Sequence, residues 1–511
     1  MTAVRRLWSV LALLTLVSAS ANAQDLSAFE KKTTVKKLDN GLTVIIYERP
    51  EAPVFSYATV VNAGSAQEVP GITGLAHMFE HMAFKGNDLV GTNDWAAEQE
   101  ALKRVEEAYA AYDRERRRET GRDEERVKQL EKEWRDAMGA ADKFVVTDEF
   151  TKVVENAGGV GLNAFTATDV TAYFFSMPSN RFELWSYLES ERYRAPFLRE
   201  FYKERDVVME ERRMRVESSP IGRLLEQFMS TAFIAHPYGV RGIGHMSDLQ
   251  TISATDAVEF FKTYYVPANM VLAIVGDVKA SEAMPLIERY FGRLPKAPAP
   301  EPLRTVEPKQ NAERTVILRE ASQPMYIEGY HRPSVNHPDD PVYTAIEMLM
   351  SSGRTSRLYK SLVRDKKVAV QASGFNGFPG EKYPNLFTYF LVPATGKTAA
   401  EMATHLHAEI ERLKTEDVTA DELASIKTRA NASLLRQLDS NAGLALQLAM
   451  AQTLRGDWRE LFRDVDRIEK VTAADIRRVA NATFVPSNRT VGMIERQAPA
   501  ATTAASKGDA Q

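Results

Sequence analysis

The sequence is 511 residues long, carries a formal net charge of −4, and is 44% hydrophobic and 26% charged. This length predicts about two to four folding units, and the balanced composition predicts sizeable hydrophobic cores. Because no basic excess is present to neutralise phosphates, nucleic acid is not expected as an obligate partner. Because the chain has no cysteine, thiolate chemistry, disulfides, cysteine zinc sites and cysteine lipidation are excluded.

The first residues have the pattern of a cleavable signal peptide. Arg5 and Arg6 precede an almost unbroken apolar run at 7–17, and small residues follow at 20–23. The run is well short of the roughly 20 apolar residues that span a bilayer, so a membrane anchor is disfavoured. We therefore expect residues 1–23 to be a signal peptide and the mature chain to lie in the periplasm without a membrane span. The absence of cysteine is compatible with such an oxidising space.

Strands and a charged helical segment follow along the chain. Asn40-Gly41, flanked by apolar alternation, predicts a hairpin over 36–48, and 55–61 reads as a strand. Residues 97–147 combine helical apolar spacing with dense charge. They predict an inserted helical hairpin whose arms are each on the order of 30 Å long. It could bind a partner or act as a lid, but the charge pattern favours a solvated spacer.

A weak internal repeat divides the chain into two halves. Tyr265-Val266-Pro267-Ala268-Asn269 and Phe484-Val485-Pro486-Ser487-Asn488 each precede a strand, at a constant offset of 219 positions. Proline-rich residues 294–313 predict an extended linker between the halves. We expect an N-terminal catalytic domain at 24–293, a C-terminal domain without the metal motif at 314–497, and a disordered tail at 498–511.

The candidate chemistry lies in the sequence His77-Met78-Phe79-Glu80-His81. The predicted helix buries Leu75, Met78, Phe79 and Met82 on one stripe and carries both histidines and Glu80 on another face. Residues four apart are neighbours on a helix, so the two imidazoles can reach one metal ion. Neutral imidazole suits zinc, and Glu80 is close enough to take a proton from a metal-bound water. The pattern is the H-x-x-E-H signature of inverzincins.

A third ligand is expected from a helix over 201–215. We expect this helix to turn Val207, Val208 and Met214 towards the core. Glu204 and Glu211 are two turns apart and share that stripe, where an acid needs a partner. Glu210 is rotated away and is expected in solvent. On sequence alone, Glu204 and Glu211 could instead pair with the arginines at 205 and 212.

Four stretches together resemble the pitrilysin and mitochondrial-processing-peptidase family of inverzincin metallopeptidases. They lie at 77–86, 161–167, 204–213 and 265–276, and the likeness extends over nearly the whole mature chain. It is strongest to the short bacterial two-domain periplasmic members. The resemblance implies an α+β fold of two homologous α/β sandwich-like halves, arranged as a clamshell, here with the helical hairpin inserted. Such a fold favours short or unfolded peptides.

The family's site residues transfer to matching positions of this sequence. The resemblance implies one Zn²⁺ per chain, held by His77, His81 and Glu211. Glu80 would be the general base, and Glu204 would orient the site without binding the zinc itself. The same resemblance makes the strand region of Asn163 and Ala164 an edge that pairs with extended substrate. An ordinary strand with a polar turn is the alternative there.

One departure concerns the second half of the chain. Active family members usually carry an Arg and, seven positions later, a Tyr that hold substrate and the developing oxyanion. Arg364 matches the first, but Gln371 occupies the position of the second. Because some bacterial members divide the two sets between subunits, the chain resembles the zinc-bearing partner of a heterodimer. A self-sufficient homodimer, with Tyr359 or Tyr383 substituting, stays open.

The sequence therefore predicts a zinc-dependent endopeptidase that hydrolyses peptide bonds in short or unfolded polypeptides. Zinc would activate water, and Glu80 would accept its proton. The alternative is a non-catalytic binding or assembly subunit that keeps the peptidase scaffold. The intact H-x-x-E-H and both downstream acids favour catalysis, whereas the absent Tyr favours the alternative.

Overall fold

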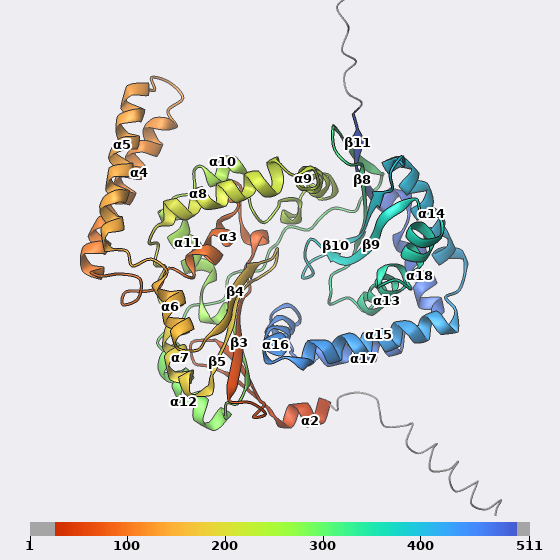
Figure 1. Ribbon diagram of the computed structural model, residues 1–511, viewed down its shortest axis with the longest axis horizontal. Helices are drawn as coiled ribbons and strands as arrows, with labels where there is room; N and C mark the ends of the chain where they lie inside the picture. Colours follow the sequence, from red (N-terminus) through yellow and green to blue (C-terminus); the bar gives the residue numbers. More distant parts are fainter. Residues whose placement is uncertain (1–25, 498–511) are drawn as a thin grey trace, which may run out of the picture.

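The computed structural model describes residues 26–497, so the predicted signal peptide at 1–23 and tail at 498–511 lie outside the described residues. The described chain is a mixed α/β structure with two mixed sheets and helices packed around both (Figure 1). This agrees with the predicted α+β fold of two sandwich-like halves. Among the described helices, none combines the length and apolarity needed to cross a bilayer.

The first sheet has six strands in the order β1-β2-β6-β3-β5-β4. Its central strands β3 and β6 are buried almost from end to end, which is typical of a sheet covered on both faces. Strand β4 forms one free edge. The strands are β1 (Thr33–Lys37), β2 (Thr43–Glu48), β3 (Val54–Val61), β4 (Val160–Thr166), β5 (Thr171–Pro178) and β6 (Met270–Gly276).

The second sheet repeats this arrangement without an equivalent of β1. Its order is β7-β11-β8-β10-β9. The pair β7 and β11 is parallel, as is β2 and β6, and the other neighbours in both sheets are antiparallel. The strands are β7 (Arg314–Glu320), β8 (Met325–Arg332), β9 (Ala369–Phe378), β10 (Asn385–Pro393) and β11 (Arg489–Arg496).

Helices flank the two sheets in chain order. Those before the linker are α2 (Leu26–Lys31), α3 (Leu75–Met82), α4 (Trp95–Arg116), α5 (Glu124–Ala141), α6 (Glu149–Asn156), α7 (Phe182–Arg192), α8 (Phe201–Arg212), α9 (Pro220–Ala232), α10 (Met246–Leu249), α11 (Ala254–Tyr264) and α12 (Ala280–Phe291). Those after it are α13 (Asp340–Ser351), α14 (Ala399–Thr415), α15 (Ala420–Asp439), α16 (Asn441–Arg455), α17 (Glu460–Glu469) and α18 (Ala473–Thr483).

The offset of 219 positions corresponds to equivalent elements. Helices α11 and α18 begin at Ala254 and Ala473, and strands β6 and β11 begin at Met270 and Arg489. A short 3₁₀ turn precedes each strand. Both helices also start with a capping box, in which a Ser or Thr and an Asp satisfy the first backbone amides. The sequence repeat therefore marks the same local structure in both halves.

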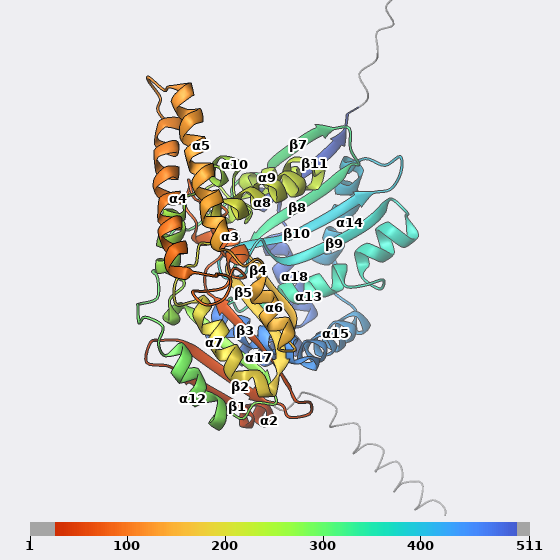
Figure 2. The same cartoon turned by 60° about the vertical axis from the view of Figure 1, so that its left-hand side comes forward.

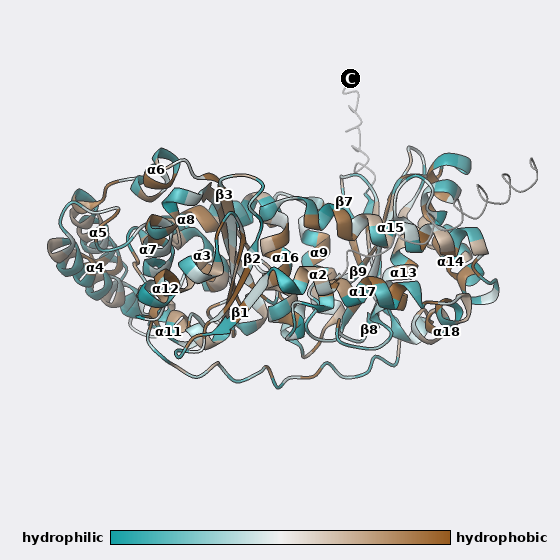
Figure 3. Cartoon of the chain, turned by 90° about the horizontal axis from the view of Figure 1, so that it is seen from below, coloured by the Kyte–Doolittle hydropathy of each residue, from teal (hydrophilic) through white to brown (hydrophobic). Residues whose placement is uncertain are grey.

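Each half contributes one helix to the other half's sheet. Helix α9 precedes the linker but packs on β7, β8 and β11 of the second sheet, where Leu224 and Phe228 share a core with Ile327 and Ile494. Helix α16 follows the linker but packs on β3 and β6 of the first sheet. In Figure 3 the first sheet lies between α3, α7 and α12 on one side and α16 on the other. The halves are therefore joined through two hydrophobic cores.

Helices α4 and α5 form an antiparallel pair that projects from the body of the molecule (Figures 1 and 2). They coincide with most of the predicted hairpin at 97–147. Tyr109 and Trp134 lie across their interface with ring centroids 5.2 Å apart, whereas the outer faces are charged and exposed. The apolar residues that recur at helical spacing in the sequence therefore pack the two arms against each other.

Candidate metal centre

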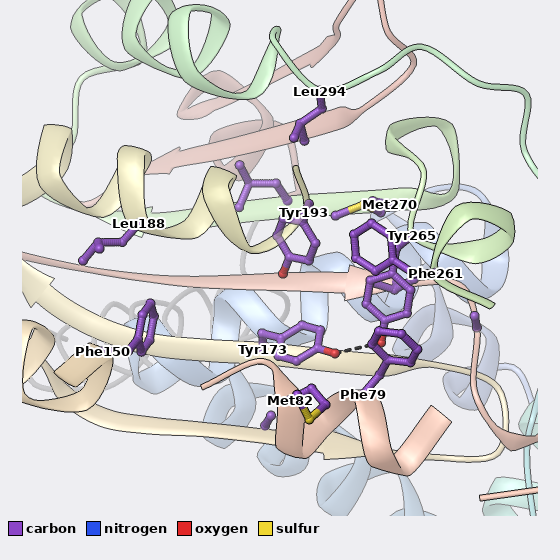
Figure 4. Close-up of a cluster of buried hydrophobic side chains, with 14 of the residues drawn as sticks. Phe79, Met82, Phe150, Tyr173, Leu188, Tyr193, Phe261, Tyr265, Met270 and Leu294 are labelled. Atoms are coloured by element: carbon purple, nitrogen blue, oxygen red, sulfur yellow. Dashed lines mark hydrogen bonds between the residues drawn. The ribbon is translucent and has the colours of Figure 1, made fainter. Parts of the chain in front are cut away.

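Helix α3 presents an apolar face to the core and a polar face to the candidate site. Leu75, Met78, Phe79 and Met82 are buried, as the sequence pattern predicted. Figure 4 shows Phe79 and Met82 packed beside Tyr173 and Tyr265, whose hydroxyls are hydrogen-bonded at 2.8 Å. His77, Glu80 and His81 are half-buried on the opposite side of the helix. The rigid core behind α3 therefore fixes the direction of the polar side chains.

The start of α3 is held by two acids that the sequence analysis did not identify. Glu68, fully buried, accepts hydrogen bonds from the backbone amides of Gly74 and Ala76 at 2.8 and 2.7 Å. Thr73 does not cap the helix with its side chain, because its hydroxyl donates to Asp248 at 2.7 Å. A glutamate six to eight residues away satisfies the amides that usually bind a neighbouring Ser or Thr.

Helix α8 carries the two downstream acids, but its orientation differs from the prediction. Val208 is buried, whereas Val207 and Met214 are exposed, so the expectation that all three face the core was wrong. The helix continues after Arg212 as a π-helical turn, 213–217, which shifts the side chains that follow it. Glu204 and Glu211 are nonetheless both largely covered, with side chains 17% and 14% exposed.

Three side chains converge at a point between α3 and α8. The Nε2 atoms of His77 and His81 lie 3.7 and 3.6 Å from Oε2 of Glu211. Their ligand atoms all lie within 4.8 Å of one another, and among residues 26–497 no other His, Asp or Glu cluster meets this criterion. Two ligand atoms of a tetrahedral zinc ion with bonds near 2.05 Å are about 3.3 Å apart. The three side chains would therefore need to move only slightly closer together to bind the ion.

The two histidines have different surroundings, which shift their pKa values in opposite directions. Burial and the neighbouring His81 lower the pKa of His77 to about 4, so its ring is neutral at pH 7 and able to bind a metal. The hydrogen bond to Glu204, at 3.3 Å from His81 Nδ1, raises the pKa of His81. Because that bond occupies Nδ1, it directs Nε2 of His81 towards Glu211.

Lys85 extends this arrangement behind the site. Its Nζ lies 2.6 Å from Oε1 of Glu204 and 3.0 Å from Oε2 of Glu200. Although burial acts to raise it, the pKa of Glu204 is lowered by the hydrogen bonds from His81 and Lys85. Glu204 is therefore held as a carboxylate that can orient the histidine.

The remaining oxygen of Glu211 and the carboxylate of Glu80 complete the site. Oε1 of Glu211 is paired with Arg215 at 2.6 Å, while Oε2 faces the histidines. The arginines at 205 and 212 bind elsewhere, Arg205 to Tyr109 and Arg212 to Glu226. Among the described residues, no donor is hydrogen-bonded to the Glu80 carboxylate, so both of its oxygens are available to a ligand. Glu210 is 58% exposed, as expected.

The base of the helical hairpin supports α8 directly. Arg205 lies over the rings of Tyr109, Trp134 and Tyr202, within 4.8 to 5.6 Å of their centroids. It also donates to the backbone oxygen of Ile252 at 2.8 Å. Because Arg205 neighbours Glu204 on α8, the hairpin of α4 and α5 packs against the helix that carries Glu204 and Glu211.

The predicted substrate strand is the free edge of the first sheet. In β4, Asn163 and Ala164 pair with Phe174 and Tyr173 of β5, and no described strand occupies the other edge. Asn163 is exposed, and its Oδ1 accepts from the Ala164 amide at 2.9 Å. Ala164 is buried. The backbone oxygen of Ala76, one residue before His77, accepts a hydrogen bond from the Thr166 hydroxyl at 3.4 Å. This edge of the sheet therefore lies beside α3.

The second-half residues do not contact the convergence point. Arg364 lies in a π-helical turn, 359–365, and pairs with its neighbour Asp365 at 2.6 Å. Gln371 is an exposed residue of β9. The hydroxyl of Tyr383 is hydrogen-bonded to the backbone of Leu303. Among the described residues, none of these side chains hydrogen-bonds or ion-pairs with the metal-facing set.

Comparisons with known proteins agree with this fold. The family described as Insulinase (Peptidase family M16) matches residues 43–115, which contain the H-x-x-E-H helix, and the family described as Peptidase M16 inactive domain matches 251–430. The zinc protease PqqE of Helicobacter pylori is 28% identical over 94% of this chain and 95% of its own length. A probable mitochondrial-processing peptidase subunit beta of Schizosaccharomyces pombe is 24% identical over 88% of both chains.

Solved structures give the same result. The crystal structure of a protease from Helicobacter pylori superposes with a TM-score of 0.76, at 27% identity, over 91% of this chain and 99% of that chain. The fold and the motif together are similar to those of two-half proteins of peptidase family M16, several of which are named zinc proteases.

Proposed function

We propose that this chain is a zinc-dependent endopeptidase acting on short or unfolded polypeptides. The observation that carries the proposal is the convergence of His77, His81 and Glu211 beside an unpartnered Glu80. Two neutral imidazoles and one carboxylate are the donor set of catalytic zinc, which keeps a fourth position open. Relatives of this chain are named zinc protease and mitochondrial-processing peptidase, which supports the same chemistry.

In the proposed reaction, His77, His81 and Glu211 would hold a zinc ion, which would supply Lewis acidity and a water molecule of lowered pKa. Glu80 accepts the proton of that water and later transfers it to the leaving amine. Glu204 and Lys85 hold His81 in the orientation that binds metal. The free edge of β4, at Asn163 and Ala164, pairs with the peptide backbone, which gives affinity with little dependence on side chains.

The test is cleavage of an internally quenched, unstructured peptide by the purified chain 24–511, with zinc and with a chelator. The proposal predicts zinc-dependent cleavage of the peptide and little cleavage of a stably folded protein that contains the same sequence. A folded, zinc-loaded chain that cleaves neither, alone or with a related subunit, would contradict it. That result would favour a non-catalytic subunit, which Gln371 and the inactive-domain match support.

Assembly and location are part of the proposal. Arg364 and Gln371 lie away from the metal-facing residues, so we propose that a second subunit, identical or related, supplies the Arg and Tyr pair. A molar mass near twice that of one chain in light scattering, or activity that appears only on mixing with a related subunit, would support this. We also propose export to the periplasm by residues 1–23. Detection of the chain with an intact amino terminus in the cytoplasm would contradict it.

A further inference from the structure

A small polar pocket in the second half is separate from the candidate metal centre. It has a volume of about 160 Å³ and lies between α13, the start of β10 and the loop that joins β9 to β10. Its lining is almost entirely polar. The charged and amide groups that matter are Arg332, Asp340, Glu347, Glu381, Asn385 and Arg455.

The two arginines of the pocket are already paired. Arg332 donates to Asp340 at 2.7 Å and to Asn376. Arg455 pairs with Asp464 at 2.5 Å and with Asp340 at 3.4 Å. These contacts compensate the charges of the two aspartates. They leave no arginine for the other two carboxylates of the pocket.

Among the described residues, three acceptor groups in the pocket have one donor or none. Oδ1 of Asn385 has no hydrogen-bond partner although the residue is only 1% exposed. The donation of its Nδ2 to the Tyr383 carbonyl, at 2.9 Å, fixes the orientation of the amide. Glu347 receives only the Asn376 amide, at 3.3 Å. Among residues 26–497, no group hydrogen-bonds or ion-pairs with the carboxylate of Glu381. A buried amide oxygen is normally satisfied, so Oδ1 of Asn385 indicates a missing donor beside two carboxylates that have few donors of their own.

The pKa values of the Glu347 and Glu381 carboxylates also favour a positively charged ligand. Burial raises the pKa of Glu347 to about 7. Although part of the Glu381 side chain is exposed, desolvation of its carboxyl group and the nearby Asp340 raise its pKa also. A nearby cation would relieve both carboxylates. The acids of the pocket do not bring three carboxylate oxygens within 4.8 Å of one another, since among the described residues the one group of His, Asp and Glu side chains whose ligand atoms lie that close is that of His77, His81 and Glu211.

We propose that this pocket binds a primary ammonium group. An ammonium has three donors and no acceptor, which matches the Asn385 oxygen and the carboxylates of Glu347 and Glu381. Its positive charge compensates the excess of acids over arginines. A volume of about 160 Å³ is sufficient for the ammonium and a short alkyl stem.

The position of the pocket suggests a source for the ammonium. Asp169, just beyond β4, accepts hydrogen bonds from the backbone amides of Glu381 and Lys382 at 2.7 and 3.1 Å. Thr168 donates to the Pro379 oxygen at 2.9 Å. The pocket loop is thus fastened to the carboxyl end of β4. A peptide paired antiparallel with β4 would have its upstream part at this end, so a peptide ammonium could enter the pocket. This source rests on the proposed function, whereas the ammonium site does not.

The first test measures binding without turnover. Butylammonium is titrated into the full chain at pH 8 by calorimetry, with tetramethylammonium, which has no N–H donor, as the matched ligand. We expect butylammonium alone to bind, and Glu347→Gln and Glu381→Gln each to weaken it about tenfold, as for loss of a charged hydrogen bond. Glu411→Gln, at an exposed pair on α14, should change nothing. Equal binding of both ligands, or no effect of either pocket variant, would overturn the proposal.

The second test identifies the source. Quenched peptides with a free or an acetylated amino terminus, and with or without an upstream Lys, are compared by KM. A lower KM for ammonium-bearing peptides that Glu381→Gln abolishes, with kcat unchanged, assigns a peptide ammonium. Equal KM values with pocket-dependent butylammonium binding assign a small free amine and leave the site established. If no peptide is cleaved, the proposed function fails, while the calorimetric result still decides the ammonium site.

Discussion

The ring of His81 is held between two glutamates of one helix. Its Nδ1 lies 3.3 Å from Glu204, and its Nε2 lies 3.6 Å from Glu211. Glu204 in turn contacts Lys85 through its other oxygen, at 2.6 Å. The seven-residue spacing of the two acids on α8 therefore places one acid behind the imidazole and one beside its metal-facing nitrogen.

Replacing Glu204 by Gln should weaken zinc binding by about 10- to 100-fold, because the partner that orients His81 loses its charge. The measurement is a competition titration with a chromogenic chelator. Glu210→Gln is the matched control, since Glu210 lies on the same helix, is exposed and pairs only with Arg213. Equal zinc affinity of the Glu204 variant and the control would show that Glu204 does not position the ligand.

Zinc removal should lower thermal stability without unfolding the chain at 25 °C. A ligand that binds only the folded state stabilises it by about 4 kcal/mol at a thousandfold excess over Kd. We expect chelation to lower Tm by several degrees in scanning calorimetry. The His77→Ala variant should have the low Tm with or without zinc. A chelator-sensitive Tm in that variant would mean that the stabilising metal binds elsewhere.

Phe228→Ala tests the exchange of helices between the halves. Phe228 is fully buried, lies on α9 before the linker, and packs with Ile327 and Ile494 of the second sheet. Truncation should reduce the free energy of unfolding by about 3–5 kcal/mol, measured with urea. Hydrogen exchange should accelerate in β8 and β11. The exposed Val207→Ala should change stability by less than about 0.5 kcal/mol. Unchanged protection of β8 and β11 would contradict the observed packing.

The ion pair of Glu422 predicts a pH dependence of stability. The bidentate contact with Arg357, at 2.8 and 2.9 Å, lowers the pKa of Glu422 from 4.5 to about 2. Because the folded-state pKa is the lower one, the stabilisation is complete above about pH 4.5 and is lost as the pH falls towards 2.

Urea unfolding of wild type and Glu422→Gln, at pH 7 and at pH 3, measures this effect. The variant should be less stable at pH 7, and the difference should shrink at pH 3. Glu416→Gln, at an exposed pair with Arg412, should show no such change. A difference between wild type and the Glu422 variant that grows on acidification would have the wrong sign for this account.

The sequence was most informative where function depends on local spacing. The i, i+4 histidines and the two-turn spacing of Glu204 and Glu211 each specify one side of a helix. The 219-position repeat identified α11 with α18 and β6 with β11 because cap, turn and strand recur in register. The roles of Asn163, Ala164 and Arg364, and domain boundaries at 24–293 and 314–497, stay predictions.

The sequence was least informative where a contact joins distant segments. The apolar face of α9 requires a hydrophobic partner, but its pattern does not specify which sheet supplies it. The π-helical turn at 213–217 changes the helical period, so the 3.6-residue pattern placed Met214 on the wrong side. Glu68 was missed because a glutamate that caps a helix six residues later has no short sequence signature.

The most direct test of the account is the peptidase activity of Glu80→Gln with its zinc content measured on the same sample. Glutamine keeps the size of the side chain but accepts no proton, so we expect one zinc per chain and a rate reduced by at least about 10². Wild-type chain assayed in parallel, with any subunit that it requires, is the reference. A zinc-loaded Glu80→Gln chain that cleaves peptide as fast as wild type would contradict Glu80 as the general base.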